Sequence, residues 1–305
     1  MSIGNDRLFG RNSASPRRAA GPLLAFAVAL LFGATAGHSQ WLETKITLPD
    51  SLGGALLPCC LTTDTSERYV YVGAQGFFDQ GGGVYVVDAE ARSRVAKIPS
   101  VSISAVCSNT RRNKVYAADS ARNRVLAISC ATNQVVATIS TGTTPLALCY
   151  NSIDDKVYAV NYDSDDLTVI DCLMDSVIKT IHTGDRPVSI CYNPASNRVF
   201  CAAHDTLLVI DGASDSIVAG RAGSWPGPLV VNAPANRVYA SNSGVGLMVL
   251  DGATGEVLDT MISGYWMCLN SHTQKLYTLD NNDVRIFDCT ADTLIKAHRV
   301  FVWVV

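Results

Sequence analysis

Three carboxylates crowd one short polar segment, NYDSDD at residues 161–166, and carboxylates are the side chains that hard cations bind. Asp163, Asp165 and Asp166 would supply oxygen ligands to Ca²⁺, which takes about six to eight of them. No glycine and no distal glutamate completes a calcium-loop motif in this segment. The pattern therefore favours a solvated acidic loop, with calcium binding by these three aspartates as the weaker alternative.

Aromatic and cationic residues occupy similar polar segments elsewhere in the chain. Aromatic rings there, including Tyr162, either stack on a sugar ring or a partner surface or cap the edge of the core. Loops that vary between otherwise similar units are the usual place for binding residues. Our candidate ligand-binding residues are Phe77, Phe78, Asp79, Asp163, Asp165, Asp166, Arg186, His204, Asp205 and Trp225.

The sequence lacks the common motifs of catalytic and phosphate-binding sites. It contains no G-x-S-x-G elbow, no H-E-x-x-H pair and no G-x-G-x-x-G turn. The glycines at 81–83 predict a flexible loop rather than a phosphate cradle, because no helical pattern follows them. We expect no catalytic residues, no cofactor and no resident metal.

The segments that contain these residues belong to a sequence repeat. Aligned on a Val-Tyr pair, six copies are marked by Tyr71, Tyr116, Tyr158, Phe200, Tyr239 and Tyr277. A period near 40 residues is typical of a propeller or a solenoid. In the copy at 145–182, four apolar runs of four to seven residues alternate with turn residues, and no window has helical periodicity. The sequence therefore predicts an all-β fold, a β-propeller of four-stranded blades.

The predicted domain spans residues 40–305 as a single propeller. Its repeats cover about 54–98, 101–140, 144–182, 186–222, 227–262 and 264–300. An acid ends most of the third runs, and an Asp side chain there can accept bonds from backbone N–H groups two residues on and close a hairpin turn. We expect a turn-forming role for these acids and for the Asn residues before the second run. They are Asp171, Asp211, Asp251, Asp288, Asn113, Asn197 and Asn236.

The repeat phrase carries a family resemblance. The pattern that carries the resemblance is K/R-V-Y-A, then V-I-D-G-A-T-x-x-V-V-A-T-I and T-G-x-x-P, and it is best matched at residues 113–145 and 155–187. The repeat resembles the YVTN-type repeat of surface-layer-related β-propellers. The resemblance covers nearly all of residues 41–298 and implies an exported propeller without specifying an activity. Six-bladed NHL or YWTD repeats are the alternative. Lactonase-like propellers coordinate a metal through acids, Asn and His on the first strands, whereas the first runs here contain no Asp, Glu or His.

The number of blades stays open between two arrangements. One is a seven-bladed ring whose last blade consists of a strand at Leu42–Leu48 plus the tail VFVWVV at 300–305. The other is six blades closed by one extra strand. An unpaired apolar tail is an aggregation hazard, which suggests a truncated chain.

Ten cysteines follow the repeat rather than a metal-site spacing. Cys60, Cys107, Cys149, Cys191 and Cys268 are assigned to one position of the first run, where Val230 stands in the remaining copy. One Cys per blade does not supply the closely spaced pairs of zinc sites. We expect most of them to be free, small apolar residues, which suggests a reducing or anaerobic habitat.

The N-terminus has the composition of a secretory signal. Arg11, Arg17 and Arg18 precede an apolar run at 21–37 that ends in a small-residue site. The run is shorter than the roughly 20 apolar residues of a membrane span. Residues 1–39 are therefore predicted to be a signal peptide, cleaved between Ala36 and Gln40, and the mature chain to be exported: periplasmic, secreted or at the cell surface, without membrane insertion after cleavage.

The net charge of the mature chain limits the classes of binding partner that we expect. The mature chain keeps 20 basic against 26 acidic residues, which argues against nucleic acid. One basic residue per repeat precedes the second run, and we expect these to be solvated surface charges: Lys114, Lys156, Arg198, Arg237 and Lys275. The function that fits best is a non-catalytic binding or interaction platform with an unknown protein or carbohydrate ligand at the loop rim. A lactonase-like metal-dependent hydrolase or lyase and a cell-surface structural array protein are the alternatives.

Overall fold

A computed structural model describes residues 56–64, 68–76, 81–223, 225, 227–242, 245–261, 266–279 and 283–299. Met1–Glu43 and Thr44–Val305 form two units, and every described residue belongs to the second. The predicted signal peptide, the strand at Leu42–Leu48 and the tail at 300–305 lie outside the described residues. So do the candidate residues Phe77, Phe78 and Asp79.

Twenty-four short strands make up the described chain, together with one 3₁₀ turn, η2 (Ser120–Arg122). The first two sheets contain β1 (Leu56–Thr63), β2 (Tyr69–Gly76), β3 (Gly83–Asp88), β4 (Ser93–Pro99), β5 (Ile103–Asn109), β6 (Lys114–Asp119), β7 (Arg124–Ser129) and β8 (Gln134–Ser140). The next two contain β9 (Pro145–Asn151), β10 (Lys156–Asn161), β11 (Asp166–Asp171), β12 (Ser176–His182), β13 (Ser189–Asn193), β14 (Arg198–Ala202), β15 (Thr206–Asp211) and β16 (Ser216–Ala222). The last two contain β17 (Leu229–Asn232), β18 (Arg237–Asn242), β19 (Gly246–Asp251), β20 (Val257–Met261), β21 (Trp266–Asn270), β22 (Lys275–Leu279), β23 (Asp283–Asp288) and β24 (Thr293–Arg299).

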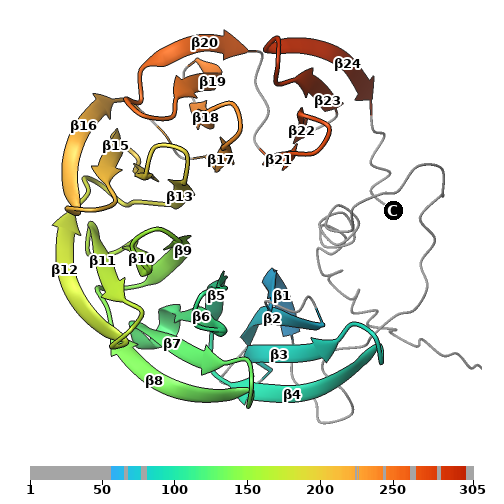
Figure 1. The fold of residues 1–305 in the computed structure, drawn as a ribbon, viewed down its shortest axis with the longest axis vertical. Coiled ribbons are helices and arrows are strands. Elements are labelled where there is room, and N and C mark those ends of the chain that lie inside the picture. Colours follow the sequence, from blue (N-terminus) through green and yellow to red (C-terminus); the bar gives the residue numbers. More distant parts are fainter. Residues whose placement is uncertain are drawn as a thin grey trace, which may run out of the picture. The chain divides into compact units, whose positions relative to one another are not determined.

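Each sheet is an antiparallel meander of four consecutive strands, here called blades 1 to 6 in chain order. Figure 1 shows the blades around a common centre, with the first strand of each inside and the fourth outside. Successive first strands contact each other, from β1 against β5 through to β17 against β21. The all-β, propeller-like fold expected from the repeats is confirmed. Among the described residues no helix is long and apolar enough to cross a membrane.

The core lies between neighbouring blades. The middle strands are apolar on both faces because each face meets another blade: in blade 3 Val157, Tyr158, Ala159 and Val160 are all fully buried. Tyr158 and Val169 of blade 3 pack with Val199 and Ile210 of blade 4 in one such cluster. Burial thus depends on the adjacent sheet, as expected for a radial repeat.

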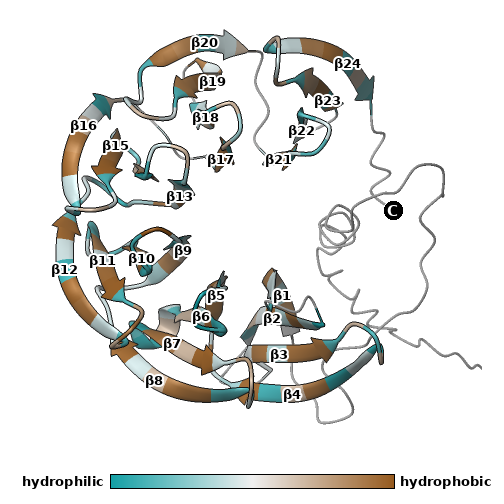
Figure 2. Ribbon diagram, viewed as in Figure 1, coloured by the Kyte–Doolittle hydropathy of each residue, from teal (hydrophilic) through white to brown (hydrophobic). Residues whose placement is uncertain are grey.

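The outermost strands combine exposed apolar residues with a bulge. In β12 the register shifts between Val169 and Ile170 of the neighbouring strand, so that Ile178 has no partner and is 50% exposed. The same shift recurs in every fourth strand, and Figure 2 shows the apolar segments along this outer belt. A bulge twists an edge strand away from pairing, so this device protects the apolar belt against edge-to-edge association.

A tyrosine and a basic residue tie each of three blades to the next. Tyr158 Oη of β10 donates to Asp215 Oδ1 in the turn after β15 at 2.6 Å, and Lys156 Nζ lies 2.7 Å from Asp215 Oδ2. Tyr116 and Lys114 bind Asp175 in the same way, both at 2.6 Å. Tyr239 and Arg237 do so with Asp292. The prediction that these basic residues are solvated surface charges is wrong for these three, because each reaches a carboxylate of the next blade.

Asparagines at the ends of the first strands form a second set of ties. Asn109 Nδ2 donates to Asp155 Oδ1 at 2.9 Å, and Asn193 Nδ2 donates to Asn236 Oδ1 at 2.7 Å. The accepting residues have positive φ, which Asn and Asp tolerate better than other side chains. The turn role predicted for Asn197 and Asn236 is confirmed, and the structure adds that these turns face the preceding blade.

The expected role of the acids after the third strands is also confirmed. Asp211 Oδ1 accepts from Ser214 N at 2.9 Å, and Asp251 Oδ1 accepts from Ala253 N and Thr254 N at 2.9 and 2.8 Å. Backbone donors are the main cause that lowers the pKa of Asp211, followed by the Ser214 hydroxyl. These acids therefore close the hairpins.

All ten cysteines are thiols in the structure. Cys107, Cys149, Cys191 and Cys268 stand opposite the repeat's aromatic residue, as the alignment predicts. The assignment of Cys60 to that position is wrong: in β1 Thr62 faces Tyr71, and Cys60 lies two residues earlier, opposite Gly73. The first strand of blade 2 has the same register shift, and the pairing makes Cys60 the equivalent of Ala105 there, opposite Ala118.

Candidate functional site

Three consecutive loops on one edge of blades 3 and 4 bring candidate residues together. They are the β10–β11 loop, the β12–β13 connection and the β14–β15 loop. His204 N donates to Asp185 O at 2.8 Å, and Thr183 N donates to Asp165 O at 3.0 Å. The connection between blades is thereby fixed on both sides, so the side chains it carries have defined positions.

Tyr162, Arg186 and His204 form the centre of this surface, which we call the rim cluster. The Arg186 guanidinium carbon lies 5.9 Å from the centroid of the Tyr162 ring, within the range of a cation–π contact. The His204 and Tyr162 ring centroids are 6.1 Å apart with an interplanar angle of 79°, an edge-to-face arrangement. Arg186 is exposed, and Tyr162 and His204 are half-buried. The sequence predicted Arg186 and His204, and the structure places them around Tyr162.

Backbone conformation and a carboxylate hold Arg186 in place. Its φ is 47°, in the left-handed region, and its amide donates to Asp165 Oδ1 at 2.8 Å. Gly184, two residues earlier, has φ 91°, and a Cβ there would meet Asp205 Oδ1 at 2.7 Å. Such positions cost conformational energy and persist where surrounding contacts enforce them. The β12–β13 connection therefore holds the backbone of Arg186 in a fixed conformation before any ligand binds.

The acidic residues predicted as calcium ligands do not converge. Asp163 Oδ2 accepts from Thr144 Oγ1 at 2.5 Å, Asp165 Oδ1 accepts from the Arg186 amide, and Asp166 Oδ1 accepts from Asn161 Nδ2 at 2.6 Å. Each carboxylate thus binds a different partner. No group of three or more His, Cys, Asp or Glu in the described part of the chain is placed to hold a metal ion. These aspartates act as loop braces in this structure.

Asp205 has a similar bracing position beside the rim cluster. Its Oδ1 accepts from Asp185 N at 3.0 Å, and its carbonyl accepts from Gly223 N at 3.0 Å. Asp163, Asp185 and Asp205 are exposed around the cluster and retain free oxygen lone pairs as acceptors. The cluster therefore offers a guanidinium and an imidazole at its centre and carboxylates at its border.

Trp225 requires a correction. Its ring is 1% exposed and packs with Leu229 and Val238 in the core between blades 4 and 5, so it cannot stack on a ligand at the surface. Trp266, at the start of β21, is 57% exposed instead. Trp266 is not predictable as a surface residue from the sequence, because tryptophan in a strand is usually buried and tertiary packing alone decides which ring faces water.

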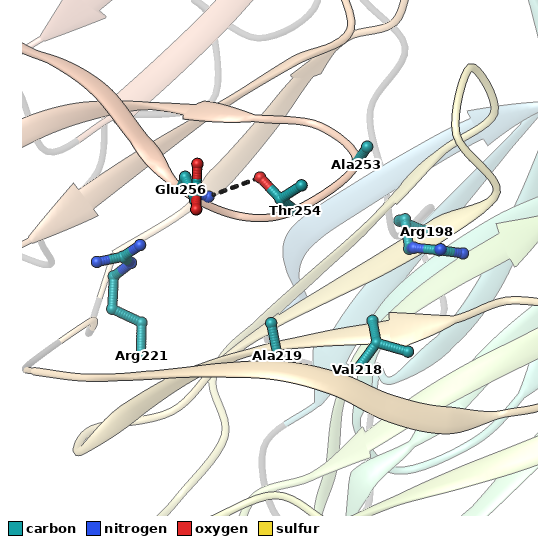
Figure 3. Close-up of a pocket in the computed structure, with 7 residues that line it drawn as sticks. All are labelled: Arg198, Val218, Ala219, Arg221, Ala253, Thr254 and Glu256. Atoms are coloured by element: carbon teal, nitrogen blue, oxygen red, sulfur yellow. Dashed lines mark hydrogen bonds between the residues drawn. The ribbon is translucent and has the colours of Figure 1, made fainter.

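A second candidate is a recess between blades 4 and 5. Its volume is about 390 Å³ and its lining consists of Arg198, Val218, Ala219, Arg221, Ala253, Thr254 and Glu256. Figure 3 shows Arg221 and Glu256 at one end, Arg198 at the other, and Val218 and Ala219 between them. The lining therefore contains two arginines and one glutamate beside the apolar side chains of Val218 and Ala219.

The recess lies where the tie between blades is missing. Here Phe200 replaces the tyrosine and Gly255 replaces the turn acid, so neither the hydroxyl nor the carboxylate of the other junctions is present. Arg198 turns back to Asp211 of its own blade instead of reaching the next turn. Its Nε has no hydrogen-bond partner within the described residues. The replacement of the repeat tyrosine by Phe200, together with that of the turn acid by Gly255, is the sequence signal that would have located this recess.

Chemically, the rim cluster is the better binding surface of the two. Arg186 forms no ion pair within the described ranges, whereas Arg198 is engaged with Asp211. A guanidinium and an imidazole beside a ring suit a ligand that carries both an anionic group and a flat or ring-shaped surface. The acceptors at its border suit hydroxyl donors.

Comparisons with known proteins bear on the fold alone. No protein-family model matches the chain, and no curated protein matches it. Among solved structures, a hydrazine synthase chain of Kuenenia stuttgartiensis is similar, with a TM-score of 0.62 and 14% identity, over 87% of this chain and 90% of that one. At this identity the likeness shows a shared architecture and carries no activity across.

Proposed function

We propose that the protein is an exported, non-catalytic β-propeller that serves as a binding platform, with its ligand at the rim cluster. The observation that carries the proposal is the convergence of Tyr162, Arg186 and His204 from loops of two blades. Rigid blades hold these loops through ties such as Tyr158 to Asp215, so binding needs little reorganisation. A preorganised surface of this kind favours recognition over chemistry.

The ligand class that fits is an acidic saccharide, one that contains uronic acid units. Arg186 and His204 would bind its carboxylate, and Tyr162 would lie against its ring. The exposed carboxylates of Asp163, Asp185 and Asp205 would accept its hydroxyl groups. A neutral saccharide would lose the ionic contact, and a nucleic acid would meet repulsion from the same acids.

Calorimetric titration with a hexuronate oligosaccharide tests this proposal. We expect binding that weakens with added salt, because Arg186 is exposed to solvent. Arg186→Ala should weaken it at least tenfold, about 1.4 kcal/mol. Arg122→Ala is the matched control, since it removes one exposed cation from the rim loop of blade 2. Equal affinity of both variants, or tighter binding of a neutral oligosaccharide or a protein partner, would overturn the proposal.

We further propose that the ring has seven positions and belongs with YVTN-type propellers. The end face of blade 6 is less covered than the same face of the blade before it. Asn270 is exposed and Tyr277 half-buried, whereas Asn232 and Tyr239 in the same repeat positions are buried. Further β-structure outside the described residues would cover them. Nitration of Tyr277 as slow as that of Tyr239 in the full chain is the expected result; rapid selective nitration of Tyr277 would contradict it.

The export proposal rests on the basic segment, apolar run and small-residue site within residues 1–39. Cleavage after Ala36 would leave Gly37 as the first residue, and cleavage after Ser39 would leave Gln40. N-terminal sequencing of the protein recovered outside the cytoplasm should therefore give a start within residues 37–40. An intact N-terminus on protein confined to the cytoplasm would refute export.

A further inference from the structure

Two thiols lie side by side on the first strand of the described chain. Cys59 and Cys60 are consecutive residues of β1, and their Sγ atoms are 3.7 Å apart. Consecutive side chains of a regular strand point to opposite faces. The register shift between Pro58 and Cys60 breaks this alternation, because a bulge places an extra residue against one partner. The bulge therefore explains how neighbouring thiols meet.

Gly73 provides the space for this arrangement. A Cβ on Gly73 would lie 2.4 Å from Cys60 Sγ and 2.7 Å from Ile103 Cγ2. The equivalent residues of the other blades all carry a side chain: Ala118, Val160, Ala202, Ser241 and Leu279. Glycine thus occurs in the one described blade whose first strand has paired thiols. β5 and β9 have the same bulge without paired cysteines, so what distinguishes blade 1 is the pair of thiols together with the glycine that accommodates them.

The sulfur separation fits one metal ion. With Zn–S bonds of about 2.3 Å, two sulfurs 3.7 Å apart subtend about 107° at the ion, close to the tetrahedral angle. Thiolates also select soft or borderline cations over Ca²⁺ and Mg²⁺. We propose that Cys59 and Cys60 form a dithiolate site for a soft divalent cation of the zinc class.

The site is open on one side. Cys59 is exposed, and its thiol donates to the Ile103 carbonyl at 2.9 Å. Two protein sulfurs leave the remaining coordination positions to water or to a group of a ligand, as in zinc sites with an open position. Binding breaks two S–H bonds, forms two sulfur–metal bonds and releases two protons without electron transfer.

A disulfide is the less favourable state of this pair. Adjacent Cα atoms are about 3.8 Å apart across a trans peptide, shorter than the roughly 4.4–6.8 Å of ordinary disulfides. A bond between them would be strained and easily reduced. The free dithiol is consequently the state available for a metal ion.

Equilibrium dialysis of the reduced full-length protein against Zn²⁺, followed by elemental analysis, tests the site. We expect Cys59→Ser, Cys60→Ser and Gly73→Ala each to bind one molar equivalent less than the unaltered protein. Cys107→Ala, at a first-strand position of blade 2, should bind as much as the unaltered protein.

A Cd²⁺ titration gives a second readout through the thiolate-to-metal absorption band, which should fall in the Cys59 and Cys60 variants. Cys59 is exposed, so Cys59→Ser should keep the fold even if Cys60→Ser does not, and circular dichroism checks both. Equal metal content in Cys59→Ser and the unaltered protein, or no metal bound by either, would overturn the site.

Discussion

The Tyr158 hydroxyl of blade 3 donates a 2.6 Å hydrogen bond to the Asp215 carboxylate in a turn of blade 4. The Tyr158 ring is fully buried, and Lys156 binds the other oxygen of the same carboxylate. Burial is the largest cause that raises the pKa of Tyr158, followed by the Asp215 hydrogen bond. The tyrosine therefore stays protonated and remains a donor across the blade junction.

Removal of this hydroxyl should destabilise the protein. We expect Tyr158→Phe to lower the free energy of unfolding by about 1.5–3 kcal/mol, the range for hydrogen bonds to charged groups. Urea denaturation measures the change. A double-mutant cycle with Asp215→Ala separates the bond from general packing loss. A coupling energy near zero would show that the two groups do not stabilise each other.

The missing tie between blades 4 and 5 should be restorable. Phe200→Tyr and Gly255→Asp reproduce the pair found at Tyr158 and Asp215, and the positive φ of Gly255 is also found at Asp215. A Cβ at Gly255 would lie 2.6 Å from Val209 Cγ2, so Val209 must shift. Each single change buries a polar group without its partner and should destabilise. The double variant should be more stable than the sum of the singles by about 0.5–3 kcal/mol. Strict additivity in thermal denaturation would refute the proposed equivalence of the junctions.

Stability should fall in acid, in part through Asp155. Burial alone raises the pKa of Asp155, but hydrogen bonds from Asn109, Arg112 and Tyr150 outweigh it and hold the pKa below its ordinary value. A lowered folded-state pKa contributes stability above the unfolded-state pKa, and this contribution is lost as the pH falls through the folded-state pKa.

We expect the free energy of unfolding to decrease as the pH is lowered from about 5 to 2. Asp155→Asn should be less stable at neutral pH and should show a shallower decline, because the titrating group is gone. Asn accepts the positive φ of 56° at this position, which limits backbone strain. Parallel acid curves for both proteins would contradict the role given to Asp155.

Thiol reactivity should differ sharply along the chain. The hydrogen bond with Cys60 lowers the pKa of the exposed Cys59 thiol, whereas burial raises the pKa of Cys172 to about 11 and that of Cys201 to about 12. Thiolates are the reactive form. Iodoacetamide labelling followed by mass spectrometry should modify Cys59 first and leave Cys172 and Cys201 unmodified in the folded protein. Early labelling of Cys172 would contradict this order.

The sequence predicts the strands well because their pattern is local. Short apolar runs between turn residues give the four strands of each blade, and the Asp211 and Asp251 turns follow from side chains that bind their own backbone. The register of β1 escapes such reasoning, since only its pairing with β2 shows that Thr62, and not Cys60, faces Tyr71.

The candidate site was predicted in part for the same reason. Arg186 and His204 lie on loops, where exposure follows from the fold, and both reach the rim cluster. Trp225 was misplaced because its burial depends on a neighbouring blade, and Lys156 because its partner Asp215 is 59 residues away. Contacts between neighbouring blades can be assigned in a sequence only when the residues that meet at each blade junction are known.

Hydrogen exchange on the full-length protein with and without the hexuronate oligosaccharide tests the binding platform most directly. We expect slower exchange in the loops at residues 161–166, 183–188 and 203–206, which carry Tyr162, Arg186 and His204. The outer strands β20 and β24 should exchange unchanged. Protection confined to other loops or to the recess at Arg198 and Glu256, or no protection at saturating oligosaccharide, would contradict it.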